Sequence, residues 1–295
     1  MTDPAPLQRI EARTAEIGGA LAVNRLLPSR HCRTIGAWCF LDHAGPATFA
    51  PGGGMRVGPH PHIGLQTFTW MIKGEVLHRD SLGNVQTIRP GQINLMTAGR
   101  GIAHTEESLS GETTLHAAQL WIALPQTHWD CPPAFDHYPD LPRWSAAGCD
   151  LTLLAGTWEG HRAPTRLYSP LVGLDLRSDS GATLTPALDP GFEYGLMVLE
   201  GAATIDGQTF AANELAVLGR GRDRCALTLA PTARAILVGG KPLGYEIHMW
   251  WNFVAPERAL IAQAQRDWET GDTRFSEVPG FDGPRLTAPA LPPGY

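Results

Sequence analysis

Residues 66–73 of the sequence read Gln-Thr-Phe-Thr-Trp-Met-Ile-Lys and are followed by a glycine. The large apolar side chains Phe68, Trp70 and Ile72 fall on every second residue, which is the period of a β-strand. The residues between them include Met71 and two threonines, so both faces of the strand can be buried in the wall of a barrel. This stretch therefore predicts a barrel strand.

Further strand signals follow this stretch. Residues 76–78 and 85–88 flank the Ser-Leu-Gly-Asn sequence at 81–84, which has the composition of a hairpin turn. Pro90 and Gly91 then precede another apolar run. The chain contains 33 glycines and 25 prolines, which favours many short strands joined by tight turns over long helices.

A similar pattern returns in the second half of the chain. The Lys-Gly pair at 73–74 corresponds to a Glu-Gly pair at 200–201, and the Gly-Arg-Gly triplet at 99–101 recurs at 219–221. Strand-like runs lie at comparable positions around both sets of glycines. This is a diverged internal repeat of a barrel-forming unit, so we predict an all-β fold with two barrels in tandem.

The boundary between the two copies is expected in the proline-rich segment 125–144, because its prolines disfavour both a helix and a central strand. We predict one barrel over residues 1–135 and a second over 136–295. The second includes a C-terminal helix over 257–269, where the apolar residues form one stripe. Gly271 ends this helix, which we expect to pack across a barrel face.

Charge and cysteine content narrow the possible functions. The formal net charge of −6 argues against a nucleic-acid-binding surface. The five cysteines are odd in number and lack C-x-x-C spacing, so neither a disulfide framework nor a cysteine zinc site is expected. No stretch approaches the roughly 20 apolar residues needed to span a bilayer. We expect a soluble, cytoplasmic protein with no membrane contact, and a monomer.

Two short motifs carry the candidate chemistry. His60 and His62 are two residues apart, as are His104 and Glu106. In an extended segment such residues point to the same side, so two adjacent strands could bring three imidazoles and one carboxylate to a single point. Prolines next to the first pair lack amide donors, which places that segment at a strand start or a sheet edge.

These donors suit Fe(II), Mn(II), Ni(II), Cu(II) or Zn(II), and four protein ligands leave positions open for water, O₂ or a chelating substrate. The competing interpretation is that the histidines are ordinary loop residues. In the second repeat Arg224 and Ala226 occupy the matching positions, so only the first barrel is expected to hold a metal. His78 lies on an expected strand, and whether it points inward, to the core or to the surface stays open.

The motif region resembles the pirin family of the cupin superfamily. The resemblance is carried by the runs His-Pro-His-Ile-Gly-Leu-Gln-Thr at 60–67, Pro-Gly at 90–91 and Met-Thr-Ala-Gly-Arg-Gly-Ile-Ala-His-Thr-Glu at 96–106. Weaker similarity includes 239–242 and 250–253. General cupins often place a ligand glutamate where this chain has Gln66, a departure that favours pirins. Gln66 is either a hydrogen-bond partner of the site or an ordinary strand residue.

The resemblance implies a bicupin fold with iron in the N-terminal barrel, held by His60, His62, His104 and Glu106. It also implies a quercetin 2,3-dioxygenase acting on a flavonol and O₂, in which Glu106 accepts the 3-hydroxyl proton. The alternative is an iron-dependent redox sensor or regulatory protein that binds a protein partner. A cavity over the metal would favour the enzyme. A metal-dependent isomerase is a weaker third interpretation.

Overall fold

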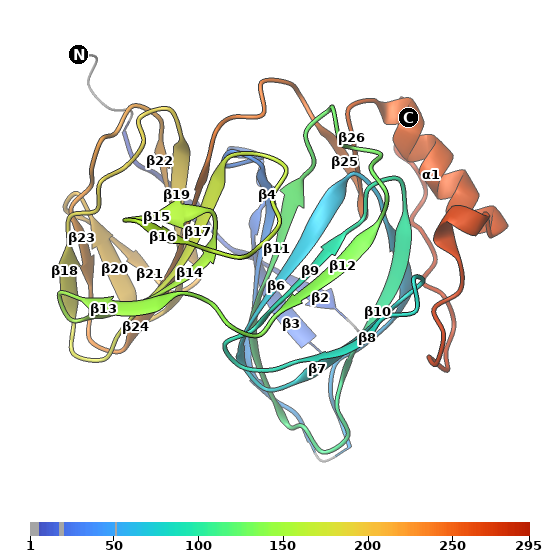
Figure 1. Ribbon diagram of the computed structural model, residues 1–295, viewed down its shortest axis with the longest axis horizontal. Helices are drawn as coiled ribbons and strands as arrows, with labels where there is room; N and C mark the ends of the chain where they lie inside the picture. The colour runs from blue at the N-terminus through green and yellow to red at the C-terminus, as the bar shows by residue number, and fades with distance from the viewer. Residues whose placement is uncertain (1–5, 18–20, 51) are drawn as a thin grey trace. The chain divides into compact units, whose positions relative to one another are not determined.

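The computed structural model describes residues 6–17, 21–50 and 52–295, and it confirms an all-β fold with a C-terminal helix (Figure 1). The chain forms two compact units. The site unit, named for the histidines it contains, comprises Ala15–Val23, Ala44–Pro139 and Gly244–Tyr295. The companion unit comprises Met1–Thr14, Asn24–His43 and Asp140–Leu243. The two units are therefore interleaved along the sequence.

The site unit is built on two antiparallel sheets whose facing apolar side chains, among them Val57 and Met71, form one core cluster. The larger sheet contains, in spatial order, β12 (Ala134–Tyr138), β9 (Ile93–Thr97), β6 (Leu65–Lys73), β11 (Thr114–Ala123), β4 (Trp38–Thr48), β3 (Leu21–Leu27) and β2 (Arg13–Ile17). The smaller sheet contains β5 (Arg56–His62), β10 (Ile102–Ser108), β7 (Val76–Asp80) and β8 (Val85–Ile88). The predicted strand at 66–73 and the predicted hairpin at 76–88 are confirmed. Strands β2, β3 and β4 contribute residues to both units.

The companion unit repeats this arrangement of a seven-stranded and a four-stranded sheet. The larger sheet contains, in spatial order, β1 (Gln8–Glu11), β22 (Glu214–Gly219), β19 (Glu193–Glu200), β24 (Ala233–Gly240), β17 (Leu171–Ser178), β14 (Cys149–Ala155) and β13 (Arg143–Ala146). The smaller sheet contains β18 (Ala182–Leu184), β23 (Leu227–Leu229), β20 (Ala202–Ile205) and β21 (Gln208–Ala211), and a separate short ladder joins β15 (Thr157–Trp158) to β16 (His161–Arg162). The hairpin β20–β21 is the counterpart of β7–β8, so the predicted internal repeat is confirmed.

The proline-rich segment 125–144 is more than a linker. Five of its residues form β12, which pairs with β9, and β13 begins at its end. Both strands lie at the edge of a sheet and pair on one side only, so neighbouring prolines interrupt few backbone hydrogen bonds. The predicted domain limits, 1–135 and 136–295, stay a prediction about where the chain can be divided.

The C-terminal helix α1 (Arg258–Thr270) forms close to its predicted span. It ends at Gly271, whose φ of 75° is left-handed, and the 3₁₀ turn η1 (Thr273–Phe275) follows. No helix in the described ranges is long and apolar enough to cross a membrane.

The helix belongs to the site unit, although it was expected with the second domain. Its buried residues Ile261, Ala264 and Trp268 share a core cluster with Ile63 and Ala103, next to the predicted metal motifs. The hairpin of β25 (His248–Trp250) and β26 (Phe253–Ala255) lies alongside the helix (Figure 1). The apolar stripe was readable from the sequence, but its packing partner was not.

The close approach of Gly64 to β26 gives a test of this packing. A Cβ at Gly64 (φ +68°) would lie 1.9 Å from the carbonyl oxygen of Val254, whereas one at Gly271 (φ +75°) would meet nothing closer than 3.7 Å. We expect Gly271→Ala to cost about 1 kcal/mol through backbone strain, and Gly64→Ala to cost about 2–4 kcal/mol because the strands must also separate. Denaturant unfolding of both variants measures the difference, and equal losses would contradict this packing.

Candidate metal centre

Two neighbouring strands carry the histidines. β5 and β10 pair antiparallel, and their register places His104 opposite His60 and Ile102 opposite His62. His60 and His62 project from the same face because they are two residues apart on a strand. β5 is the edge strand of its sheet, which accommodates its prolines. The predicted arrangement, with two adjacent strands presenting both motifs, is confirmed.

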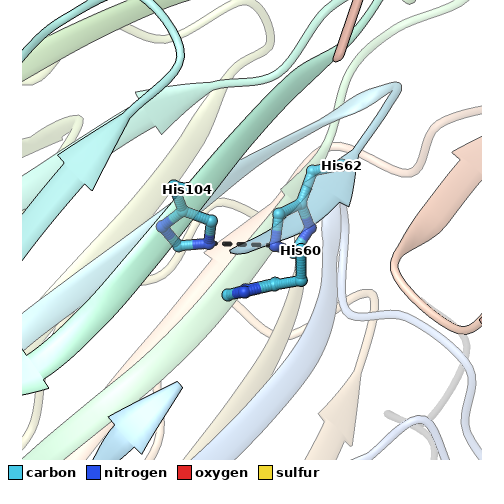
Figure 2. Close-up of side chains that lie close together, drawn as sticks. All are labelled: His60, His62 and His104. Carbon is cyan, nitrogen blue, oxygen red and sulfur yellow. Dashed lines mark hydrogen bonds between the residues drawn. The ribbon is translucent and has the colours of Figure 1, made fainter. Parts of the chain in front are cut away.

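The three imidazole rings converge on one space (Figure 2). Nε2 of His62 lies 3.1 Å from Nε2 of His104, and the ring centroid of His60 lies 4.2 Å from that of His104. One ligand nitrogen from each residue lies within 4.8 Å of the others. At metal–nitrogen distances of about 2.1 Å, two nitrogens bound at right angles are separated by about 3.0 Å. The observed spacing therefore fits a shared metal ion.

Burial keeps these imidazoles uncharged, as metal ligands must be. Burial lowers the pKa of His60 to about 4, and it lowers the pKa of His62 and of His104 well below the usual 6.5, with the neighbouring His60 adding to the effect. His60 Nδ1 lies 2.9 Å from the Gly58 carbonyl oxygen, which can only accept. The Nδ1 of His60 therefore carries the hydrogen, and its Nε2 retains a lone pair for a metal.

Glu106 stands slightly apart from the three histidines. A register shift separates it from His104 on the β5 side of β10, and on the other side it pairs with His78 of β7. It is not a member of the group whose ligand atoms all lie within 4.8 Å. Burial raises the pKa of its carboxyl to about 7. The structure thus brings together three of the four predicted ligands, and the ligand role of Glu106 stays a prediction.

Glu106 lines a largely apolar cavity in the site unit. The cavity has a volume of about 40 Å³ and is partly open to solvent. Its other lining residues are Leu21, Val23, Ala44, Met55, Thr69, Met71, Val76, Leu115, Ala117 and Gln119. The polar pair among them is tied together, because Thr69 Oγ1 donates to Gln119 Oε1 at 2.7 Å. The carboxyl of Glu106 therefore faces a small, mainly apolar space.

The structure also settles where His78 and Gln66 lie. His78 is buried beside the cluster, with Nδ1 3.3 Å from Nδ1 of His104 and Nε2 3.0 Å from Oδ2 of Asp80. Sequence reasoning left His78 unplaced, although its spacing from Asp80 is the same two residues as in the ligand motifs. Gln66 is buried in β6 and donates to Thr97 Oγ1 at 2.9 Å.

Family models match both halves of the chain. The model described as Pirin matches residues 20–122, and the model of the Pirin C-terminal cupin domain matches residues 173–276. A Pseudomonas aeruginosa protein named "Putative quercetin 2,3-dioxygenase" is 64% identical over 286 residues, covering 97% of this chain and 91% of that protein. A pirin-like protein of Caulobacter vibrioides is 34% identical over 277 residues, covering 91% of this chain and 94% of that one.

Solved structures agree with these matches. The crystal structure of a quercetin 2,3-dioxygenase from Acinetobacter baumannii superposes with a TM-score of 0.96 at 48% sequence identity. The match covers 98% of this chain and 97% of that one. The similarity therefore extends over both units, and the range matched by the Pirin model spans the histidine cluster.

The raised pKa of Glu106 predicts a pH-dependent stability difference in the metal-free protein. Between the ordinary value of 4.5 and about 7, the folded state holds a proton that the unfolded state has released, so this group's contribution to stability is lost as pH rises. Glu106→Gln removes that titration. We expect the variant to gain about 2–3 kcal/mol relative to the parent between pH 4.5 and 7.5, measured by denaturant unfolding.

Glu112→Gln is the matched control, because backbone hydrogen bonding to Thr114 lowers the pKa of Glu112 instead. Its stability difference from the parent should stay constant above pH 5, since Glu112 is ionised there in both the folded and the unfolded protein. A Glu106→Gln difference that is equally flat would mean that Glu106 is solvated.

Proposed function

This chain belongs to the pirin family, and on that premise we propose that it is a metal-dependent dioxygenase that cleaves flavonols such as quercetin. The observation that carries the proposal is the buried cluster of uncharged imidazoles, together with an apolar cavity in the same unit that Glu106 lines. A metal site needs the cluster, and apolar walls suit an aromatic substrate. A regulatory protein that senses only a metal needs no such cavity.

We assign the metal to His60, His62, His104 and Glu106, with Fe(II) as the proposed ion and Mn(II), Ni(II), Cu(II) or Zn(II) as alternatives. A divalent ion held there would supply Lewis-acid activation of a chelating enol and a place for O₂ to react. The three histidines are buried and uncharged, so they bind a cation without first losing protons. A cation would also offset the cost of keeping the Glu106 carboxylate buried.

Glu106 is the proposed catalytic base as well as a ligand. Without a metal, burial raises the pKa of this carboxyl to about 7, and a bound cation would favour the carboxylate form that accepts protons. Its carboxylate would accept the proton of the flavonol 3-hydroxyl. The apolar walls at Leu115, Val23 and Met71 would have to move apart to admit the aromatic rings, and would then exclude water from that transfer.

Oxygen uptake with quercetin tests the proposal directly. We expect purified, iron-loaded protein to hold about one metal per chain by elemental analysis and to consume O₂ when quercetin is added. His62→Ala should lose both the metal and the uptake by at least about a hundredfold, because it removes one of three close nitrogens. His128→Ala, at an exposed histidine outside the cluster, serves as the control and should behave like the parent. Stoichiometric metal without quercetin-dependent uptake would refute the flavonol assignment and leave the metal site standing.

Filling the cavity separates substrate binding from metal binding. Ala117 lines the cavity and is 5% exposed, so Ala117→Phe places a ring where the substrate is expected. We expect KM for quercetin to rise about tenfold or more while metal content stays at the parent level, with Ala117→Val giving a smaller effect in the same direction. Unchanged KM in a folded, metal-loaded Ala117→Phe protein would place the substrate elsewhere.

A further inference from the structure

A buried chain of three side chains leads from the hairpin β7–β8 to the histidine cluster. Asp80 and His78 lie on β7, and the register of β7 with β10 places Asp80 opposite His104. His78 stands between the other two, with Nε2 3.0 Å from Asp80 Oδ2 and Nδ1 3.3 Å from His104 Nδ1. The exposed fractions of Asp80, His78 and His104 are 0%, 4% and 1%. Water therefore has little access to these hydrogen bonds.

The direction of the hydrogen bonds follows from the carboxylate at one end. Hydrogen bonds from His78 and Asn84 outweigh the effect of burial and lower the pKa of Asp80, so it is ionised and can only accept. Nε2 of His78 must then donate, and its Nδ1 faces Nδ1 of His104 at 3.3 Å. A His104 that binds the proposed metal through Nε2 must carry its hydrogen on Nδ1, where Nδ1 of His78 can accept it. That Nε2 is the atom 3.1 Å from His62 Nε2.

From this geometry we infer that Asp80 and His78 are positioning residues, which fix the tautomer and orientation of His104 so that its Nε2 faces the metal. The inference rests on the proposed metal site, to which it adds two residues. Metal-bound imidazoles commonly donate their second N–H to a partner that orients the ring and raises its basicity, and loss of that partner typically lowers metal affinity 10–100-fold. Here the carboxylate of Asp80 acts on His104 through the imidazole of His78, which lies between them.

In this relay of Asp80, His78 and His104, the first two residues are each held in place by further contacts. Oδ1 of Asp80 accepts hydrogen bonds from the backbone amides of Leu82 and Asn84, at 2.9 and 3.1 Å, and from the side-chain amide of Asn84. The ring of His78 stacks on Phe135 of β12, with centroids 4.3 Å apart and planes inclined by 16°. The turn thus fixes the carboxylate, and the stacking fixes the plane of the ring between it and His104.

His78 is not itself a metal ligand in this arrangement. Its two nitrogens are both engaged, one with Asp80 and the other with His104. Direct ligation would require Nδ1 to lose its contact with His104 or Nε2 to lose its contact with Asp80. The two roles make different predictions. Loss of a relay residue lowers the metal affinity of the site, but the number of imidazoles bound to the metal stays the same.

Asp80→Asn is the first test, because it keeps the shape of the side chain but removes its negative charge and allows it to donate as well as accept. We expect the affinity for Zn(II), measured by competition with a chelator, to fall 10–100-fold at unchanged one-to-one stoichiometry. Asp130→Asn, the same substitution at an exposed aspartate outside this hydrogen-bonded chain, is the matched control, and its affinity should stay within about threefold of the parent. Equal losses in both variants, or none in Asp80→Asn, would overturn the inference.

The tautomer of His104 gives a readout that a purely structural role would not change. In ¹⁵N–¹H NMR spectra of the metal-free parent, the hydrogen of His104 should be on Nδ1, and Asp80→Asn should shift it toward Nε2. His78→Phe keeps the stacking on Phe135 and should also weaken Zn(II) binding 10–100-fold. If His104 carries its hydrogen on Nε2 in the parent, the relay is wrong. Neither measurement uses quercetin, so a failed flavonol assay with intact Zn(II) binding would refute the substrate and not the relay.

Discussion

The site depends on the register between β5 and β10. Because side chains alternate across a strand, a slip of one residue would turn His104 away from the face that carries His60 and His62. The pairing of β10 with β5 shifts between His104 and Glu106, and His104 belongs to the histidine cluster whereas Glu106 lies outside that group.

Burial shifts the pKa values of the three histidines and of Glu106 in opposite directions, and both shifts favour the uncharged form. It lowers the pKa values of the three histidines and raises that of Glu106, so every one of these groups favours its uncharged form without a metal. A cation reverses the balance for the carboxylate and uses the lone pairs that the neutral rings already present. The metal-free interior therefore holds uncharged donors and an acid that a positive ion could bind.

Segments distant in sequence support the edge strand that carries two of the ligands. Ile63, directly after β5, bridges to Phe253 in parallel orientation, and Val254 donates its amide to the Ile63 carbonyl at 3.1 Å. Helix α1 packs in the same apolar cluster through Ile261 and Trp268. The unpaired side of β5 is thus covered by the C-terminal segment, which stabilises an edge that would otherwise be open.

The sequence by itself determined the strands, the internal repeat, the helix and the histidine pairs, because each is written in local periodicity: every second residue on a strand, every third or fourth on a helix. The two pairing strands and their shared face followed from that period as well. Only the tertiary structure decided that the C-terminal helix packs on the site unit, that residues 134–138 form an edge strand, and that His78 and Asp80 stand behind His104. Those outcomes depend on strand register and on which apolar surfaces pack together. Both involve segments that are distant in sequence, so a short stretch of chain does not determine them.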